Sequence, residues 1–168
     1  MAEKVRVLFV CLGNICRSPM AEGVFRGLVQ DRGLEGKIDC DSAGTSGWHI
    51  GEGPDPRTVE TAARHGLKLD HRGRKFTSAD FGDFDYILAM DRQNYRDIQS
   101  VQGCRQYKGS LSLMRDYDEQ SPGSDVPDPY YGGLDGFESM YDTLLRSCGG
   151  LLDEIISNKK LQDAGPPY

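Results

Sequence analysis

Apolar residues occur in this chain as short continuous runs that alternate with helix-spaced faces, an order that predicts strands and helices in turn. The first run, residues 5–10, is broken only by Arg6, which is typical of a central parallel strand buried on both faces. After a polar loop, apolar residues recur at helical spacing over residues 20–29, and Gly33 is expected to end this helix. A short second strand is expected near residues 37–40.

A glycine-rich loop and a second helix come next. Residues 42–55 hold four glycines and one proline, which indicates a loop. Asp55 suits the cap of the following helix and Pro56 its first position, while Gly66 is expected to stop it. The face of this helix that we expect to point inward consists of Val59, Ala62 and Ala63.

The alternation continues with two further strands and a long loop. A third strand is predicted at residues 84–90, with Asp91 as the candidate cap of the helix after it, and a fourth strand between residues 107 and 113. The stretch 116–133 is rich in Asp, Pro, Ser and Gly. A loop of that length in a compact domain is usually functional.

The final helix has the clearest apolar face in the sequence. Asp135 and Glu138 resemble a capping box at its start. Gly149 and Gly150 either weaken the helix locally or let another element approach closely. Its predicted core face consists of Phe137, Met140, Tyr141, Leu144, Leu145, Cys148, Leu151, Leu152, Ile155 and Ile156.

Together these elements predict an α/β fold: a single domain over residues 1–168, with a four-stranded parallel sheet and helices on both faces. A length of 168 residues fits one domain with a full core. The polar stretch from about 157 to 168 is expected to be a frayed tail. In such a fold the functional site is expected at the carboxyl ends of the strands.

Composition and charge narrow the function classes. The net charge of −6 argues against nucleic acid and anionic membranes as general partners, though not against an anionic substrate at a local site. No apolar run approaches the roughly 20 residues that span a bilayer, and residues 1–4 do not resemble a signal peptide. Five cysteines at no framework spacing favour a reducing compartment, so we expect a cytoplasmic protein. A monomer and a weak dimer both fit the sequence.

The strongest chemical signal is the loop between the first strand and the first helix. Cys11 opens it and Arg17 closes it, and between them stand Leu12, Gly13, Asn14, Ile15 and Cys16. That spacing lets the backbone N–H groups curl around an anion, next to the free N–H groups of a helix that begins at Ser18 and Pro19. We expect Cys11 to exist largely as thiolate there, and Arg17 to offer a planar fork for two phosphate oxygens. These features suggest phosphoryl transfer to cysteine.

The loop admits three other interpretations. Cys11 could simply be a small buried apolar residue. A nucleotide-binding loop is disfavoured, because the turn has neither G-x-x-x-x-G-K-[ST] nor G-x-G-x-x-G. A redox pair of Cys11 with Cys16 remains compatible with the nucleophile hypothesis, since a thiolate beside a second cysteine favours reversible oxidation.

The segment Val10 to Pro19 resembles the signature of the low-molecular-weight protein tyrosine phosphatases, and four later segments resemble that family in the same order. They are Asp41-Ser42-Ala43-Gly44-Thr45, Asp55-Pro56-Arg57, Phe84-Asp85-Tyr86-Ile87-Leu88-Ala89-Met90-Asp91, and Val126-Pro127-Asp128-Pro129-Tyr130-Tyr131-Gly132. The resemblance covers roughly residues 5 to 156. It implies a metal-independent phosphatase without cofactor. Its expected partners are phosphotyrosine-containing proteins, and its expected product is inorganic phosphate.

The resemblance also assigns roles to particular residues. It implies that Asp128 is the general acid, whereas composition alone does not separate it from Asp116, Asp118 and Asp125, which we expect to be solvated. It implies that Asp91 orients Arg17. The residues expected to hold Asn14, which suits a left-handed backbone, are Ser18, Ser42 and His71.

The resemblance further implies the walls of a substrate cleft and a redox partner. Trp48, Tyr130 and Tyr131 would flank an aromatic ring, although ordinary packing of these side chains is the alternative. In the family the cysteine that matches Cys16 forms a reversible disulfide with the nucleophile.

Three rival functions stay open. Arsenate reductases share the fold and the loop but need extra shuttling cysteines; residues 76–97 contain none, and Cys104 is the nearest candidate. Bacterial protein-arginine phosphatases also resemble this chain but typically carry threonine where Ile15 stands, and the larger Ile15 favours tyrosine. A non-enzymatic phosphate-binding module would be expected to lack the nucleophile or the acid.

Overall fold

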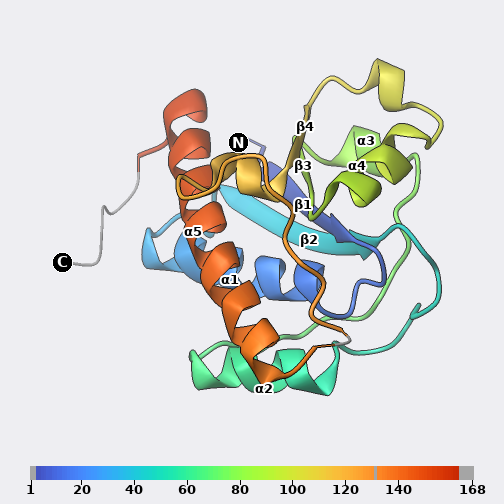
Figure 1. Cartoon of the computed structure of the whole chain (residues 1–168). Helices are drawn as coiled ribbons and strands as arrows, with labels where there is room; N and C mark the ends of the chain where they lie inside the picture. Colours follow the sequence, from blue (N-terminus) through green and yellow to red (C-terminus); the bar gives the residue numbers. More distant parts are fainter. Residues whose placement is uncertain (1–2, 131, 163–168) are drawn as a thin grey trace.

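All four strands of the central sheet run parallel, in the spatial order β2-β1-β3-β4 (Figure 1). The computed structural model describes residues 3–130 and 132–162. The strands are β1 (Val5–Cys11), β2 (Ile38–Gly44), β3 (Tyr86–Ala89) and β4 (Ser110–Leu113). The helices are α1 (Arg17–Asp31), α2 (Pro56–Arg64), α3 (Asp80–Asp83), α4 (Arg92–Gln99) and α5 (Leu134–Lys159), with 3-10 turns η1 (Cys104–Gln106) and η2 (Met114–Tyr117).

Strand β1 is buried on both faces, which confirms the prediction from its apolar run. Val7 and Phe9 belong to a core shared with α1 and α5, whereas Leu8 and Val10 belong to a second core with α4. Helices therefore cover both faces of the sheet, α1 and α5 on one side and α4 on the other (Figure 1). The predicted α/β fold with a four-stranded parallel sheet is confirmed.

Helix α5 packs closely on the turn η2. A Cβ atom at Gly150 would collide with the carbonyl oxygen of Tyr117, so glycine is needed where the two elements meet. At Gly150 the structure supports close approach of another element, whereas a Cβ atom at Gly149 would meet no atom within 4 Å. Despite the 26 residues of α5, no helix within residues 3–130 and 132–162 combines the length and apolarity that crossing a membrane requires.

Strand β2 is longer than predicted. It continues through Ser42 and Ala43 to Gly44, each of which pairs with a residue of β1, so the predicted loop starts only after Gly44. The small residues at positions 42–44 predict a loop when only their near neighbours in the sequence are considered. Pairing with a central strand overrides that preference, because strand formation depends on neighbours distant in the sequence.

Helix α2 begins as predicted but presents a different face. Asp55 caps it by accepting a hydrogen bond from the Arg57 N–H at 2.8 Å, and Gly66 adopts a positive φ of 77° after its end. The predicted inward residues Val59 and Ala63 are exposed, and only Ala62 is buried. The buried face is completed by Thr58 and Thr61, polar residues that a count of apolar positions passes over.

Both ends of α5 differ from the prediction. The capping box is wrong: Gly133 precedes the helix without a side-chain cap, and Glu138 instead binds Arg64 and His65 of the α2 region. Within the predicted core face, Leu145 is exposed. The helix runs to Lys159, past the predicted onset of the tail, and Lys160 closes it with a positive φ of 52°.

The acidic loop also corrects one expectation. Asp116 and Asp125 are exposed, but Asp118 is fully buried and accepts hydrogen bonds from Arg115 at 3.0 Å and Arg146 at 3.1 Å. Burial alone would raise the pKa of Asp118, yet the hydrogen bonds of Arg146, the Gln120 N–H and Arg115 lower it. This carboxylate ties the loop to α5 instead of being solvated.

Candidate active site

The loop from Cys11 to Arg17 lies at the carboxyl edge of the sheet, between the last residue of β1 and the first of α1. The Cys11 sulfur lies 3.0 Å from the Ser18 hydroxyl and accepts a hydrogen bond from the Asn14 N–H at 3.3 Å. These two polar contacts distinguish Cys11 from a cysteine that packs only against apolar side chains. The loop geometry therefore supports a nucleophile over an inert buried cysteine.

Asn14 adopts the left-handed backbone expected of it, with φ of 58°. Its side-chain nitrogen donates to Ser18 at 2.8 Å and to Ser42 at 3.1 Å. Its side-chain oxygen lies 2.8 Å from His71 Nε2 and accepts from the Arg74 N–H at 3.0 Å. The structure thus brings Asn14 together with all three predicted supporting residues, and adds Arg74.

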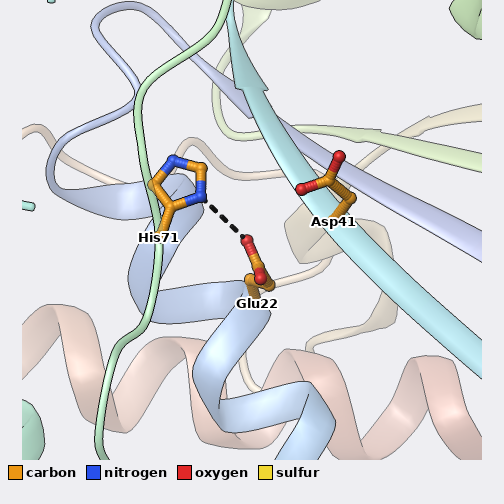
Figure 2. Close-up of side chains that lie close together, drawn as sticks. All are labelled: Glu22, Asp41 and His71. Carbon is orange, nitrogen blue, oxygen red and sulfur yellow. Dashed lines mark ion pairs between the residues drawn. The ribbon is translucent and has the colours of Figure 1, made fainter. Parts of the chain in front are cut away.

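A buried carboxylate that sequence reasoning missed lies behind this network. Glu22, only 5% exposed, accepts hydrogen bonds from Ser42 at 2.7 Å and from Arg26 at 2.8 Å, and lies 3.4 Å from His71 Nδ1 (Figure 2). Burial alone would raise the pKa of Glu22, but its hydrogen bonds with His71, Ser42 and Arg26 lower it. The ionised carboxylate therefore orients His71 toward Asn14.

Glu22, Asp41 and His71 together have the residue types of a metal site (Figure 2). Each ligand atom is nevertheless engaged within the protein. Ser42 and Arg26 donate to Glu22, the Arg74 guanidinium pairs with Asp41 at 3.1 Å, and His71 faces Asn14. A divalent cation would have to displace these donors, so the cluster suits a support for the loop better than a metal centre.

Arg17 is almost fully buried, with 3% of its side chain exposed, and three acceptors hold its guanidinium. Nη1 donates to Asp91 at 2.7 Å and to the Val126 carbonyl at 2.9 Å, and Nη2 lies 3.5 Å from Asp128. Asp91 also caps α4 through the Asn94 N–H at 2.7 Å, so both suggested roles occur together. Burial would lower the pKa of Arg17, but Cys11, Asp91 and Asp128 raise it, so the guanidinium stays charged.

A cavity of about 310 Å³ opens above the loop. Its walls include Trp48 and Tyr130, two of the predicted wall residues, together with Asp128, and Trp48 is 74% exposed. His49, which the sequence pattern did not single out, also lines the cavity and binds Glu52 at 2.9 Å. The floor consists of Cys11, Leu12, Gly13, Ile15, Cys16 and Arg17. Tyr131, the third predicted wall, lies outside the described residues.

Cys16 shares the cavity with Cys11, and both thiols are free. Burial raises the pKa of Cys16 to about 12, although the Thr58 hydroxyl acts in the opposite direction. Cys16 is therefore a protonated thiol under ordinary conditions, which distinguishes it chemically from a reactive thiolate.

Replacing Asn14 by alanine is expected to lower kcat by up to about 100-fold, because the loop loses its side-chain bonds and alanine disfavours a positive φ. Glycine at this position tolerates the backbone but makes none of the bonds. We expect Asn14→Gly to remain well below the wild type in kcat and in affinity for inorganic phosphate. Full activity of Asn14→Gly would show that backbone conformation alone matters.

A buried cysteine at the end of a central parallel strand, followed by an anion-sized loop that an arginine closes, defines the class of cysteine-dependent phosphatases. The family model of the low molecular weight phosphotyrosine protein phosphatases matches residues 6–162 of this chain. The chain therefore belongs to the low molecular weight phosphotyrosine protein phosphatase family and is a hydrolytic enzyme.

Individual relatives agree with this assignment. The low molecular weight phosphotyrosine protein phosphatase of Schizosaccharomyces pombe is 49% identical over 158 residues, covering 92% of this chain and 99% of its own. The crystal structure of YfkJ from Bacillus subtilis matches with a TM-score of 0.87 at 45% identity, covering 94% of this chain and 98% of its own. The Drosophila arginine phosphatase matches with a TM-score of 0.81 at 37% identity, covering 88% and 96%. The fold alone thus does not determine the substrate.

Proposed function

We propose that this enzyme hydrolyses phosphotyrosine in proteins through a cysteinyl-phosphate intermediate. The observation that carries the proposal is the joint contact of Arg17 with Asp91 and Asp128 at the mouth of the Cys11 loop. The Arg17 guanidinium, at the end of the loop that begins with Cys11, thus contacts the proposed acid, and all three residues line one cavity.

In the first step, the Cys11 thiolate attacks phosphorus and the bond from phosphorus to the phenolic oxygen breaks. Arg17 and the N–H groups of the loop hold the remaining phosphate oxygens, so positive charge comes from the protein and no metal ion is needed. Asp128, 43% exposed and on the cavity wall, gives its proton to the leaving phenolate.

In the second step, water attacks the cysteinyl phosphate. The Asp128 carboxylate takes the proton of the water, the bond from sulfur to phosphorus breaks, and inorganic phosphate leaves. The Ser18 hydroxyl, 3.0 Å from the Cys11 sulfur, can donate a hydrogen bond to the thiolate as it departs.

The cavity walls favour an aromatic substrate. Trp48 and Tyr130 contribute aromatic side chains to the lining of the cavity, and Ile15 contributes an apolar one. A phosphoarginine substrate would bring a polar guanidinium against Ile15, where bacterial protein-arginine phosphatases typically have threonine. We therefore propose phosphotyrosine over phosphoarginine, with arsenate reduction and plain phosphate binding as the remaining alternatives.

A direct comparison of substrates tests this proposal. The enzyme is assayed in EDTA on a phosphotyrosine peptide, on the same peptide with phosphoarginine, and on arsenate with a thiol reductant. We expect a kcat/KM for phosphotyrosine at least about 100-fold above that for phosphoarginine. A preference for phosphoarginine, or turnover of arsenate alone, would overturn the assignment.

We also propose that Cys16 protects the nucleophile against irreversible oxidation. Peroxide would convert the Cys11 thiolate to a sulfenic acid, and the Cys16 sulfur would then attack it, forming a disulfide and releasing water. Cys16 lies in the same cavity as Cys11, and five cysteines at no framework spacing fit a reducing compartment such as the cytoplasm.

Cys16→Ser should therefore be inactivated by peroxide but recover little activity when thiol is added, whereas the wild type recovers most of it. Residual activity after peroxide, with and without thiol, measures the effect. Cys40→Ser is a suitable control, because burial raises the pKa of Cys40 to about 12 and it does not line the cavity. Equal recovery of Cys16→Ser and wild type would contradict this role.

A further inference from the structure

Arg57, at the start of α2, is held in one orientation by its neighbour Asp55. Nε and Nη2 of Arg57 bind the two carboxylate oxygens of Asp55 at 3.1 and 3.0 Å, which is the paired geometry that fixes a guanidinium plane. Its side chain is only 35% exposed. Because the guanidinium plane is fixed, its two faces are available for contacts with other side chains.

Two aromatic rings contact that plane. The guanidinium carbon of Arg57 lies 5.4 Å from the centre of the Tyr130 ring and 4.8 Å from the centre of the Phe137 ring. Both distances fall within the range of cation–π attraction. Phe137 is fully buried in α5, so Arg57 joins the exposed Tyr130 to the rigid body of the protein.

The same unit also contacts the phosphate-binding loop. The Asp55 N–H donates to the Ile15 carbonyl at 2.8 Å, in the middle of the loop that contains Cys11. The Tyr130 N–H, by contrast, binds Asp128 at 3.1 Å within its own loop, and that bond does not join the loop to another element. Asp55 and Arg57 therefore connect the floor of the cavity to one of its walls.

We propose that Arg57 is a positioning residue: together with Asp55 it holds Tyr130 as a wall of the aryl-binding cavity, at a set distance from the phosphate-binding loop. This inference rests on the proposed function in so far as Tyr130 contacts the aromatic ring of the substrate. Arg57 itself is not among the residues that line the cavity. Its contribution is to the affinity for aryl phosphates, and not to the chemistry at Cys11.

The test compares Arg57→Met with the wild type on a phosphotyrosine peptide, with inorganic phosphate as competitive inhibitor. Methionine keeps an apolar stem, but it has no charge and cannot form the bidentate pair with the Asp55 carboxylate. We expect KM to rise about three- to tenfold, as for the loss of one cation–π contact, while kcat and the inhibition constant of phosphate change less than twofold. Arg57→Lys, which keeps the cation, should recover part of the affinity.

Arg64→Met is the matched control. Arg64 belongs to the same helix and binds Glu138 of α5 at 3.0 Å, but it does not line the cavity. This variant should lower the melting temperature without changing KM. If Arg57→Met likewise lowers only the melting temperature, Arg57 is merely structural and the inference is wrong.

A double-mutant cycle with Tyr130→Ala separates this inference from the proposed function. We expect Tyr130→Ala to raise KM, and Arg57→Met to add little in that background, because the ring that Arg57 holds is absent. Equal effects of Arg57→Met with and without Tyr130 would overturn the positioning role while leaving the phosphotyrosine proposal intact. An unchanged KM in Tyr130→Ala would overturn the wall itself, and the positioning role with it.

Discussion

Cys11→Ser is expected to lose turnover by at least about four orders of magnitude, the largest effect of any single substitution in this protein. The serine hydroxyl would stand where the sulfur now accepts the Asn14 N–H and meets Ser18, but it is not ionised there and attacks phosphorus poorly. The cradle for phosphate remains, because Arg17 and the loop N–H groups are unchanged. Turnover of a phosphotyrosine peptide and binding of inorganic phosphate by calorimetry give the two readouts.

Loss of turnover together with retained phosphate binding would identify Cys11 as the nucleophile. Cys40→Ser provides the control for the same chemical change at a buried position that does not line the cavity. Turnover by Cys11→Ser comparable to that of Cys40→Ser would contradict the cysteinyl-phosphate mechanism.

Asp128→Ala is expected to lower kcat on phosphotyrosine by about 10²- to 10⁴-fold, because a tyrosine phenolate leaves slowly without a proton. The loss in kcat/KM, which reports only the first step, should be much smaller for para-nitrophenyl phosphate, whose leaving group is stable as an anion. The ratio of the kcat/KM losses on the two substrates therefore reports proton donation specifically, and a general disturbance of the loop would affect both alike.

Asp125→Ala is the control for Asp128→Ala. Asp125 stands three residues earlier in the same loop and accepts a hydrogen bond from the Arg92 N–H at 3.0 Å. Its removal should leave the ratio between the substrates unchanged. A similar ratio in both variants would mean that Asp128 is not the acid and that the loop as a whole supports turnover.

Much of the fold could be predicted from local patterns. The apolar run of β1 indicated a central strand because burial on both faces leaves no room for polar positions, and β1 does lie inside the sheet. The cap of α2 at Asp55 and the left-handed Asn14 were also predictable, since each depends on a few neighbouring residues. The turn that brings the Asn14 N–H to the Cys11 sulfur likewise involves residues only three positions apart.

The residues that sequence reasoning missed depend on partners far along the chain. Glu22 is a charged residue among apolar ones on α1, and its burial makes sense only once Ser42 and His71 are beside it. Arg57 is likewise unremarkable until Tyr130 and Phe137 reach it. Asp118 was misassigned for the same reason, because Arg146 follows it by 28 residues.

The acceptors that hold the Arg17 guanidinium affect when the chain becomes active during folding. Arg17 meets Asp128 across 111 positions of sequence and the Val126 carbonyl across 109. During synthesis β1 and the nucleophile emerge first, yet β1 lacks its neighbour β3 until residues 86–89 have been made. Loop closure over such distances is slow, so the site forms late, together with the global fold. In a nascent chain, Cys11 is therefore made before the residues that hold the Arg17 guanidinium. Catalytic activity is then expected only once the whole domain has folded.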